Sequence, residues 1–393
     1  MSRPTTAEIN LSALEHNLSL IRQTVGNGVK LMCVVKAHAY GHGIKEVSRK
    51  LISLGVDYLG VATVDEAVIL KKYLGKDAPA VVLGSVFKEE ADEIARWGIT
   101  QTVADRDIAL ALSSSAKRHK KTLKVHVKVD TGMGRIGVWH TDAVDFIKWM
   151  KDLEGIQIEG IWTHLSSADE DEAFTNEQIY IFRQLINDLK NIGIDIPLRH
   201  VANSMAVIGF PDASLNLVRP GLILYGLYPK DNLKEKFQFK PVMTIKTKIV
   251  FLKDVPAGRA ISYGRKFITK KATKIATLPI GYGDGYPRVL FNKAHVLIRG
   301  ERAPVVGTVC MDQIMVDVGH IKNVKVGDEA VLLGEQAKER ISAEELAGLS
   351  GTIPYEIVCS IAPRVPRVYI EETPHSRVGN EIPHAEACGA KKL

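Results

Sequence analysis

The stretch LMCVVKAHAYGHGIKEVSRKLISLGVDYLGVAT (residues 31–63) contains a short apolar run, an amphipathic segment and a second apolar run. The runs at 31–37 and 58–63 are almost continuously apolar, whereas residues 44–54 have the spacing of a surface helix. Near-continuous apolar strands joined by helices are typical of a parallel sheet covered on both faces. The stretch therefore predicts one strand–helix–strand unit of an α/β protein.

The same unit recurs through the first part of the chain. We expect further strands at 80–84, 100–104, 123–130, 158–165, 198–204 and 216–221, and helices at 64–72, 88–97, up to 120, 143–150 and 176–191. Roughly eight such units within about 230 residues predict a TIM-type (β/α)8 barrel. An open doubly wound sheet is the alternative, although the strand-to-helix turns lack its common GxGxxG motif.

The pattern changes near Tyr225. Residues 225–241 look like a linker, and the remainder is rich in short β-type runs with one good helical segment at 342–349. We therefore expect two domains, an α/β barrel and a C-terminal mostly β domain. Their expected bounds are 10–238 for the barrel and 239–373 for the β domain, with a strand within 1–9 joining the latter and a mobile tail at 374–393.

Composition argues against several classes of protein. The chain has 393 residues, of which 46% are hydrophobic, and its net charge of +7 comes from basic residues scattered among acidic ones. No nucleic-acid motif stands out, and no stretch approaches the roughly 18 apolar residues of a membrane span. The N-terminus lacks the apolar core of a secretory signal. The four cysteines form no CxxC pair, so we expect no metal site and a reducing, cytoplasmic setting.

Polar residues gather where the predicted strands end, which is where barrel enzymes place their active sites. They are Lys36, Lys128 to Arg135, His164, His200 to Ser204, and Arg219 to Gly221. A lysine at a strand end can simply extend into solvent. A partly desolvated lysine, however, has a lowered pKa and can form an imine. Tyr40, four residues after Lys36, could reach a phosphate.

The string VKAHAYGHG around Lys36 resembles the pyridoxal-phosphate attachment motif of alanine racemases. The resemblance extends from about Ile9 to Tyr369. It is carried by VKAHAYGHG, VKVDTGMGRIG, THLSSAD, HVANSMA, VRPGLILYG, SYGR, GYGDGYPR, GTVCMDQ and IPYEIVCSIAPRVPRVY, in this order. It implies a barrel that binds pyridoxal 5'-phosphate, a second β domain, and a homodimer with shared active sites.

The resemblance also implies how the cofactor is held. Lys36 is the Schiff-base lysine, and the phosphate contacts come from Tyr40, Ser204, Gly221, Leu222 (through its backbone) and Tyr355. Arg219 faces the pyridine nitrogen and is oriented by His164, with His200 close by. Because arginine keeps its proton near neutral pH, the ring nitrogen stays unprotonated and is a weaker electron sink.

Two further basic residues are expected on the phenolic side of the cofactor. Arg135 can serve both the phenolic oxygen and a substrate carboxylate. Lys128 stands where this family often carries a carbamylated lysine, which would turn a cation into an anion beside Arg135. An unmodified lysine remains the alternative.

Racemisation needs an acid/base group on each face of a planar carbanion. The family assigns these roles to Lys36 and to Tyr263 of the partner subunit. Met311, also from the partner, is expected to donate its backbone N–H to the substrate carboxylate, with Asp312 holding that loop. Tyr263 and Tyr355 would form the inner constriction of the access corridor. Asp169 and Arg288 lie further out in this prediction.

Two positions depart from the family pattern. His38 stands where the motif usually has asparagine, and Thr308 stands where some members carry an arginine in the corridor. They affect the expected substrate breadth rather than the chemistry.

The leading hypothesis is interconversion of L- and D-alanine, which supplies D-alanine for peptidoglycan. A racemase of broader specificity is one alternative. A related pyridoxal-phosphate decarboxylase is another, although such enzymes use an acidic residue at the ring nitrogen and a cysteine acid. Arg219 and Tyr263 therefore argue against it. A non-catalytic pyridoxal-phosphate carrier would resemble the barrel alone.

Overall fold

The computed structural model describes residues 3–228 and 236–371. The predicted tail at 374–393 and part of the predicted linker lie outside these residues.

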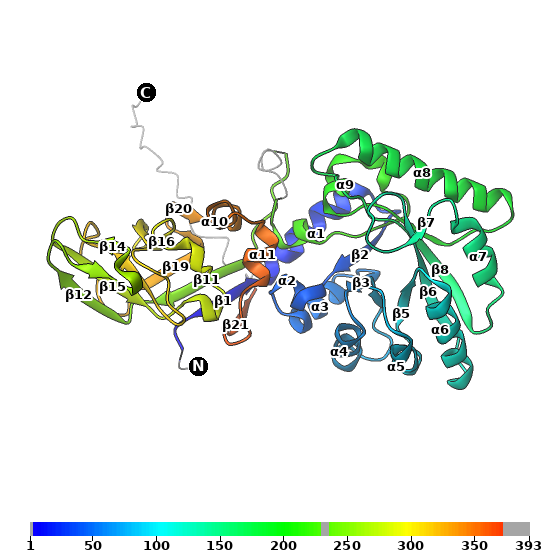
Figure 1. Ribbon diagram of the computed structural model, residues 1–393, viewed down its shortest axis with the longest axis horizontal. Coiled ribbons are helices and arrows are strands. Elements are labelled where there is room, and N and C mark those ends of the chain that lie inside the picture. The colour runs from blue at the N-terminus through cyan, green and yellow to red at the C-terminus, as the bar shows by residue number, and fades with distance from the viewer. Residues whose placement is uncertain (1–2, 229–235, 372–393) are drawn as a thin grey trace, which may run out of the picture.

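The N-terminal part forms a nearly closed parallel barrel (Figure 1). Its sheet runs in the order β10-β2-β3-β4-β5-β6-β8-β9, with every neighbouring pair parallel. The strands are β2 (Lys30–Val34), β3 (Tyr58–Val61), β4 (Ala80–Val82), β5 (Thr100–Val103), β6 (Leu123–Asp130), β8 (Ile156–Trp162), β9 (Leu198–His200) and β10 (Leu217–Val218). The short β7 (Val138–Trp139) pairs with the end of β6. Because β10 pairs back with β2, the barrel prediction is confirmed and the open-sheet alternative is wrong.

Helices cover the outside of this sheet. They are α1 (Leu11–Val25), α3 (Ile44–Ser53), α4 (Val64–Leu74), α5 (Ala91–Trp97), α6 (Arg106–Arg118), α7 (Ala143–Lys151), α8 (Glu172–Asn191) and α9 (Ser204–Gly209). Five of them begin where a side-chain oxygen accepts a backbone N–H three residues on. The capping residues are Asn10 for α1, Thr63 for α4, Asp105 for α6, Asp171 for α8 and Asn203 for α9. These caps fix where each loop turns into its helix.

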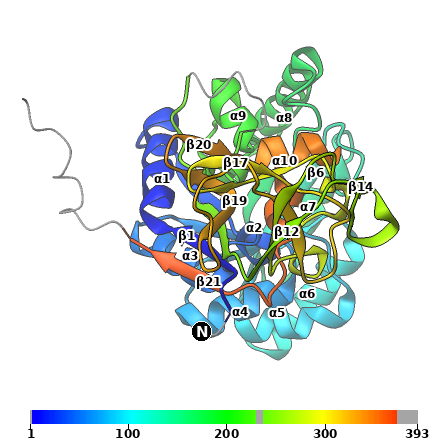
Figure 2. The same cartoon turned by 90° about the vertical axis from the view of Figure 1, so that its left-hand side faces the viewer.

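The C-terminal part is mostly β, as predicted, and faces the viewer in Figure 2. Its strands are β11 (Met243–Lys248), β12 (Phe251–Val255), β13 (Ala260–Ile261), β14 (Phe267–Ile268), β15 (Thr273–Leu278), β16 (His295–Ile298), β17 (Glu301–Pro304), β18 (Ile314–Asp317), β19 (Glu329–Gln336), β20 (Glu339–Ile341) and β21 (Arg367–Ile370). The largest sheet runs β17-β16-β19-β11-β1-β21, and β12-β15-β18 forms a smaller one. The expectation of a single helix in this part is wrong, because α11 (Pro354–Cys359) follows α10 (Ala343–Ser350).

The first strand joins the two parts. β1 (Thr6–Asn10) lies antiparallel to β11 and parallel to β21, and the chain then enters α1 of the barrel directly. The side chain of Asn10 caps α1 by accepting from the backbone N–H of Ala13 at 2.9 Å. One continuous hydrophobic core contains residues of both parts, including Ile9, Leu14 and Val331. The β-rich part is thereby packed against the barrel.

Across the residues that the structure describes, no helix combines the length and apolarity needed to cross a lipid bilayer. The same residues contain no group of three or more His, Cys, Asp or Glu side chains placed to hold a metal ion.

Gly226 provides a test of how the barrel connects to the following segment. Its φ is +72°, and a Cβ there would overlap the backbone of Lys240. Gly226→Ala should lower the free energy of unfolding by about 2–5 kcal/mol, since it adds both strain and a clash. Denaturant unfolding measures this change. The matched control is Gly348→Ala, an exposed position in α10 with nothing within 4 Å of an added Cβ. It should raise stability by about 0.5–1 kcal/mol, and equal effects of the two variants would contradict this account.

Candidate active site

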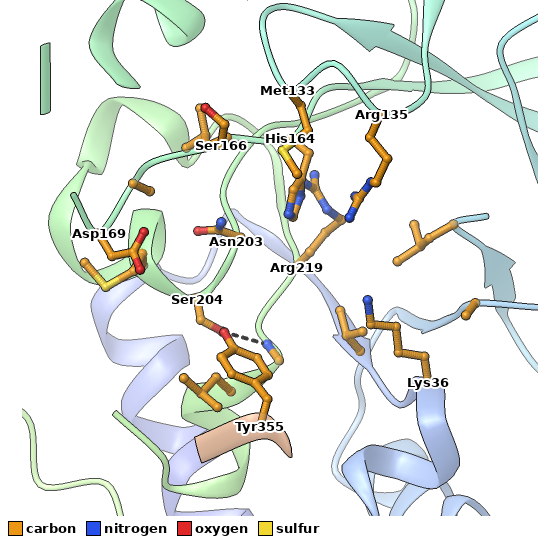
Figure 3. A pocket seen from close by; sticks show the side chains of 18 of the residues that line it. Lys36, Met133, Arg135, His164, Ser166, Asp169, Asn203, Ser204, Arg219 and Tyr355 are labelled. Atoms are coloured by element: carbon orange, nitrogen blue, oxygen red, sulfur yellow. Dashed lines mark hydrogen bonds between the residues drawn. The ribbon is translucent and has the colours of Figure 1, made fainter. Parts of the chain in front are cut away.

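A cavity of about 530 Å³ opens at the carboxyl ends of the barrel strands. The sequence-predicted residues that line it are Lys36, Tyr40, Arg135, His164, Asp169, Ser204, Arg219, Gly221, Leu222 and Tyr355. Figure 3 shows the side chains of Lys36, Arg135 and Arg219 converging on it from different elements, with Ser204 and Tyr355 nearby. The volume suits a small-molecule ligand.

Lys36 begins a left-handed turn rather than ending a strand. The strand expected at 31–37 stops at Val34, and residues 37–40 all have φ between +51° and +57°. Such a conformation costs energy for residues other than glycine, so the surrounding structure must hold it. A Cβ on Gly41 would overlap the carbonyl oxygen of Val358 in α11. The glycine therefore lets this strained turn pack directly on α11, which fixes the position of Lys36.

The environment of Lys36 favours its neutral amine. Burial lowers its pKa, and the positive charge of Arg135 lowers it further, while Glu66 acts in the opposite direction. A lysine with a lowered pKa is a better nucleophile near neutral pH.

Arg219 is held by acceptors alone. Its two terminal nitrogens donate to the carbonyl oxygens of Thr163 (2.8 Å), His200 (2.9 Å) and Val201 (3.0 Å). They also donate to Nδ1 of His200 at 3.0 Å and Nδ1 of His164 at 3.2 Å. Burial and Arg219 hold the pKa of both histidines well below the usual range, so both are neutral acceptors. Burial and then Arg135 lower the pKa of Arg219 to about 9, which leaves it charged at neutral pH.

Lys128 is fully buried and is not among the residues that line the cavity. Its Nζ donates to the carbonyl oxygen of Val129 at 2.8 Å and lies 4.9 Å from the centre of the Trp162 ring. Burial, followed by the charge of Arg219, lowers the pKa of Lys128 to about 7. A substantial fraction of this amine is therefore neutral near pH 7.

The loop that carries Arg135 is closed by Asp130. The Asp130 carboxylate accepts backbone N–H groups from Gly132, Met133 and Gly134 at 2.9 to 3.2 Å. Burial alone would raise the pKa of Asp130, but these hydrogen bonds bring it below its usual value. The carboxylate is thus used inside the loop, and the guanidinium of Arg135 is left to face the cavity.

The opposite wall has the character of an anion cradle. Ser204 Oγ accepts the backbone N–H of Gly221 at 2.9 Å, and a Cβ on Gly221 would lie 2.7 Å from the hydroxyl of Tyr40. The rings of Tyr40 and Tyr355 are 5.8 Å apart. The hydroxyls of Ser204 and Tyr40 can donate to a phosphate, which would take the Gly221 N–H in place of Ser204. This arrangement fits pyridoxal phosphate.

Apart from Tyr355, the residues predicted in the β-rich part do not line this cavity. Tyr263 and Met311 have exposed fractions of 72% and 53%, and Arg288 is exposed as well. Asp312 pairs with Arg364 at 2.7 Å. Thr308 is buried and donates to the backbone oxygen of Tyr263 at 2.8 Å, so it supports the segment that carries Tyr263. Within one described chain, these residues do not complete the cavity.

Sequence reasoning missed several residues of the site. Trp162 lines the cavity, and the centre of its ring lies 4.7 Å from the Arg219 guanidinium carbon. Met133 and Asn203 also line it; they lie within the ranges 128–135 and 200–204 predicted for the site but were given no role of their own. The signal for Trp162 was its place two residues before His164, because alternate residues of a strand share a face.

Comparison with known proteins identifies a family whose two domains match the two parts of this chain. Residues 9–229 match the family described as alanine racemase, N-terminal domain, and residues 242–369 match alanine racemase, C-terminal domain. The chain belongs to the alanine racemase family. The family, the fold class and the enzyme class expected from the sequence are thereby confirmed.

Individual relatives in the alanine racemase family are similar over nearly their whole length. An alanine racemase of Halothermothrix orenii is 48% identical over 370 residues, which cover 94% of this chain and 97% of the relative. Alanine racemase 2 of Caldanaerobacter subterraneus is 47% identical, with 94% and 95% covered. The solved alanine racemase of Clostridium difficile 630 superposes with a TM-score of 0.89 at 41% identity, with 94% and 97% covered.

Arg135 should control the reactivity of Lys36. Because its positive charge lowers the pKa of Lys36, Arg135→Gln should raise that pKa and shift amine reactivity to higher pH. The pH dependence of reductive methylation of Lys36 in the cofactor-free protein, followed by mass spectrometry, measures this shift. Glu66→Gln is the control of opposite sign, because Glu66 raises the same pKa. A shift in the same direction for both variants would rule out this electrostatic account.

Proposed function

We propose that this protein is a pyridoxal-phosphate-dependent racemase that interconverts L- and D-alanine. The observation that carries the proposal is that Lys36, with its lowered pKa, and Arg219, which can only donate, line one cavity. The membership of the chain in the alanine racemase family supports alanine as the substrate. Pyridoxal phosphate condenses with amines and acidifies the proton on the α-carbon of the amino acid bound to it.

The cavity contains the donors that this cofactor needs. The hydroxyls of Tyr40, Ser204 and Tyr355 and the backbone N–H groups of Gly221 and Leu222 would hold the phosphate. Arg219, kept in place by His164 and His200, would donate to the ring nitrogen. Arg135 would hold the phenolic oxygen and the substrate carboxylate.

Two groups would carry protons on opposite faces of the substrate. The amine of Lys36, favoured in its neutral form by burial, takes a proton from one face. The phenol of Tyr263 from the partner subunit serves the other face. The backbone N–H of Met311 from the partner would bind the substrate carboxylate.

The exposure of Tyr263 and Met311 supports a homodimer with shared active sites. Both are large, largely exposed side chains on the β-rich part, away from the cavity of their own chain. Nearby exposed apolar residues of the same part are Ile268, Tyr282 and Val289. A partner subunit would cover these residues and complete the access corridor with Asp169, Tyr355 and Arg288.

The alternatives differ in what the site would need. A decarboxylase of the related type would place a carboxylate beside the ring nitrogen. Here Arg219 occupies that position, and none of its hydrogen-bond partners is a carboxylate. A racemase of broader specificity has the same machinery and would differ in the walls of the corridor. The cytoplasmic setting and the supply of D-alanine to peptidoglycan stay predictions.

Replacement of Lys36 tests the proposed function most simply. Wild-type protein reconstituted with pyridoxal phosphate should racemise L-alanine faster than other members of a panel of L-amino acids. Lys36→Ala should lose the absorbance of covalently bound cofactor together with racemisation. Chiral chromatography and absorbance spectra provide the measurements. Normal racemisation by Lys36→Ala would refute the mechanism, and equal rates across the panel would favour the broader specificity.

Tyr263 should act on one face only. Tyr263→Phe keeps the ring but removes the proton, and should lower kcat by about 10²- to 10⁴-fold. In deuterium oxide, exchange of the α-proton should fall selectively when one enantiomer, but not the other, is the starting material. Tyr282→Phe is the matched control, because Tyr282 is a second exposed tyrosine of the same part. Equal loss of exchange from both enantiomers would count against the two-base assignment.

Lys128 should react with carbon dioxide, as its pKa of about 7 leaves much of the amine neutral. The neutral amine adds to carbon dioxide and releases one proton, giving a carbamate beside Arg135. At fixed dissolved carbon dioxide, carbamate should increase as pH rises through 7. Carbon-13 NMR with labelled bicarbonate should show one carbamate signal that Lys128→Met removes and Lys124→Met keeps. A wild-type spectrum without this signal would leave Lys128 unmodified.

A further inference from the structure

A line of hydrogen bonds leads from Arg219 down through the inside of the barrel. Arg219 Nη1 meets His200 Nδ1 at 3.0 Å, His200 Nε2 meets His126 Nδ1 at 2.9 Å, and His126 Nε2 meets Glu159 Oε2 at 3.3 Å. Both histidines are fully buried, and Glu159 has an exposed fraction of 8%. Glu159 also pairs with Lys124, on the far side of His126 from the cavity, at 2.7 Å. A carboxylate remote from the cavity is thus connected to the arginine that lines it.

The chemistry of arginine fixes the direction of every bond in this line. A guanidinium can only donate, so Nδ1 of His200 must accept. Because neutral imidazole carries one proton, that proton lies on Nε2 of His200, which then donates to Nδ1 of His126. His126 is left with its proton on Nε2, which donates to Glu159. Each ring therefore has one tautomer compatible with all three contacts.

The charges along the line are equally well defined. Burial lowers the pKa of His126, and burial together with Arg219 lowers that of His200, so both rings are neutral. Burial would raise the pKa of Glu159, but hydrogen bonds from His126 and Lys124 bring it below its usual value. Glu159 is therefore ionised. Tyr58, whose pKa is raised by burial and by Glu159, stays a neutral phenol.

The other end of the line is rich in basic groups. Lys36, Lys128 and Arg135 each interact electrostatically with Arg219 or with its partner His164. The carboxylates nearby act on the two lysines, Glu66 on Lys36 and Asp130 on Lys128. The hydrogen-bond partners of Arg219 are two neutral rings and three carbonyl oxygens. A buried cation without a nearby counter-charge is costly, and polarised hydrogen-bond chains can carry the influence of a distant one.

Packing alone does not require these polar groups. A neighbouring layer of the barrel interior is apolar and consists of Met32, Val81, Leu198 and Leu217. Branched apolar residues usually fill such layers, and buried polar groups are costly unless they are paired. The line thus occupies space that apolar side chains could fill.

We propose that Glu159 is a positioning residue of the active site. Acting through His126 and His200, its carboxylate supplies the counter-charge for Arg219 and keeps that guanidinium fixed as a donor toward the cavity. This inference rests on the proposed function in one respect only, which is that the group facing Arg219 in the cavity is the ring nitrogen of pyridoxal phosphate.

Glu159→Gln tests the proposal, because it preserves the shape and removes the charge. Lys124→Gln is the matched control, because it removes the other ion-pair partner of Glu159 and leaves the line intact. The readouts are the dissociation constant of pyridoxal phosphate and the pH midpoint of the absorbance titration of the bound cofactor. Glu159→Gln should weaken cofactor binding about tenfold. It should also lower the pH midpoint, since a site with less negative charge releases protons more readily. Lys124→Gln should neither weaken cofactor binding nor lower the pH midpoint.

A double-variant cycle distinguishes a line of hydrogen bonds from a charge that acts through space. In a His126→Leu background, or His126→Asn where the leucine variant does not fold, Glu159→Gln should have no further effect on either readout. The same shift with and without His126 would overturn the proposal, as would a Glu159→Gln variant with wild-type affinity and midpoint.

The cofactor-free protein separates this inference from the proposed function. Nitrogen-15 NMR of labelled histidine should show His126 and His200 as neutral rings protonated at Nε2. Either ring protonated at Nδ1 would overturn the line itself. A wild-type protein with these tautomers that fails to bind pyridoxal phosphate would instead refute the proposed function and leave the line standing.

Discussion

The buried guanidinium of Arg219 is the constraint on which the site depends. Three backbone oxygens and two neutral imidazole nitrogens accept its protons, so its charge and its direction are both fixed. The acceptors come from the ends of β8 and β9, which are neighbouring strands, and Arg219 follows β10 at the other edge of the sheet, so the near-closure of the barrel brings them together. Whatever ring atom meets Arg219 in the cavity must itself accept a hydrogen bond. A pyridine nitrogen in its unprotonated form meets that requirement.

The second structural condition is the contact between the barrel and the β-rich part. β1 belongs to the sheet of the β-rich part and continues directly into α1, and α11 packs on the left-handed turn that begins at Lys36. The same α11 carries Tyr355 into the cavity. α11 therefore contacts the turn that begins at Lys36, contributes Tyr355 to the opposite wall of the cavity, and forms part of the junction between the two parts. The strained conformation of the turn persists because its packing against α11 prevents it from relaxing.

The barrel could be predicted from the sequence because parallel strands buried on both faces consist of nearly continuous apolar runs. For β6 even the expected bounds, 123–130, agree with the structure. It predicted the cavity residues through a family resemblance, since Ser204 or Gly221 alone reads as an ordinary cap or turn. It could not predict the left-handed conformation after Lys36, because that depends on contact with α11. The six-residue α11 is too short to show periodicity. The link between His126 and Glu159 joins neighbouring strands, so only their register places the two side chains together.

The proposed mechanism depends on an unprotonated ring nitrogen that accepts a hydrogen bond from Arg219. Nitrogen-15 NMR of the enzyme reconstituted with ring-labelled pyridoxal phosphate measures this protonation state directly. The predicted result is the chemical shift of an unprotonated pyridine at neutral pH, and this shift should change in variants that replace Arg219. A protonated ring nitrogen in the wild-type enzyme would contradict the account, because Arg219 has no acceptor to offer it.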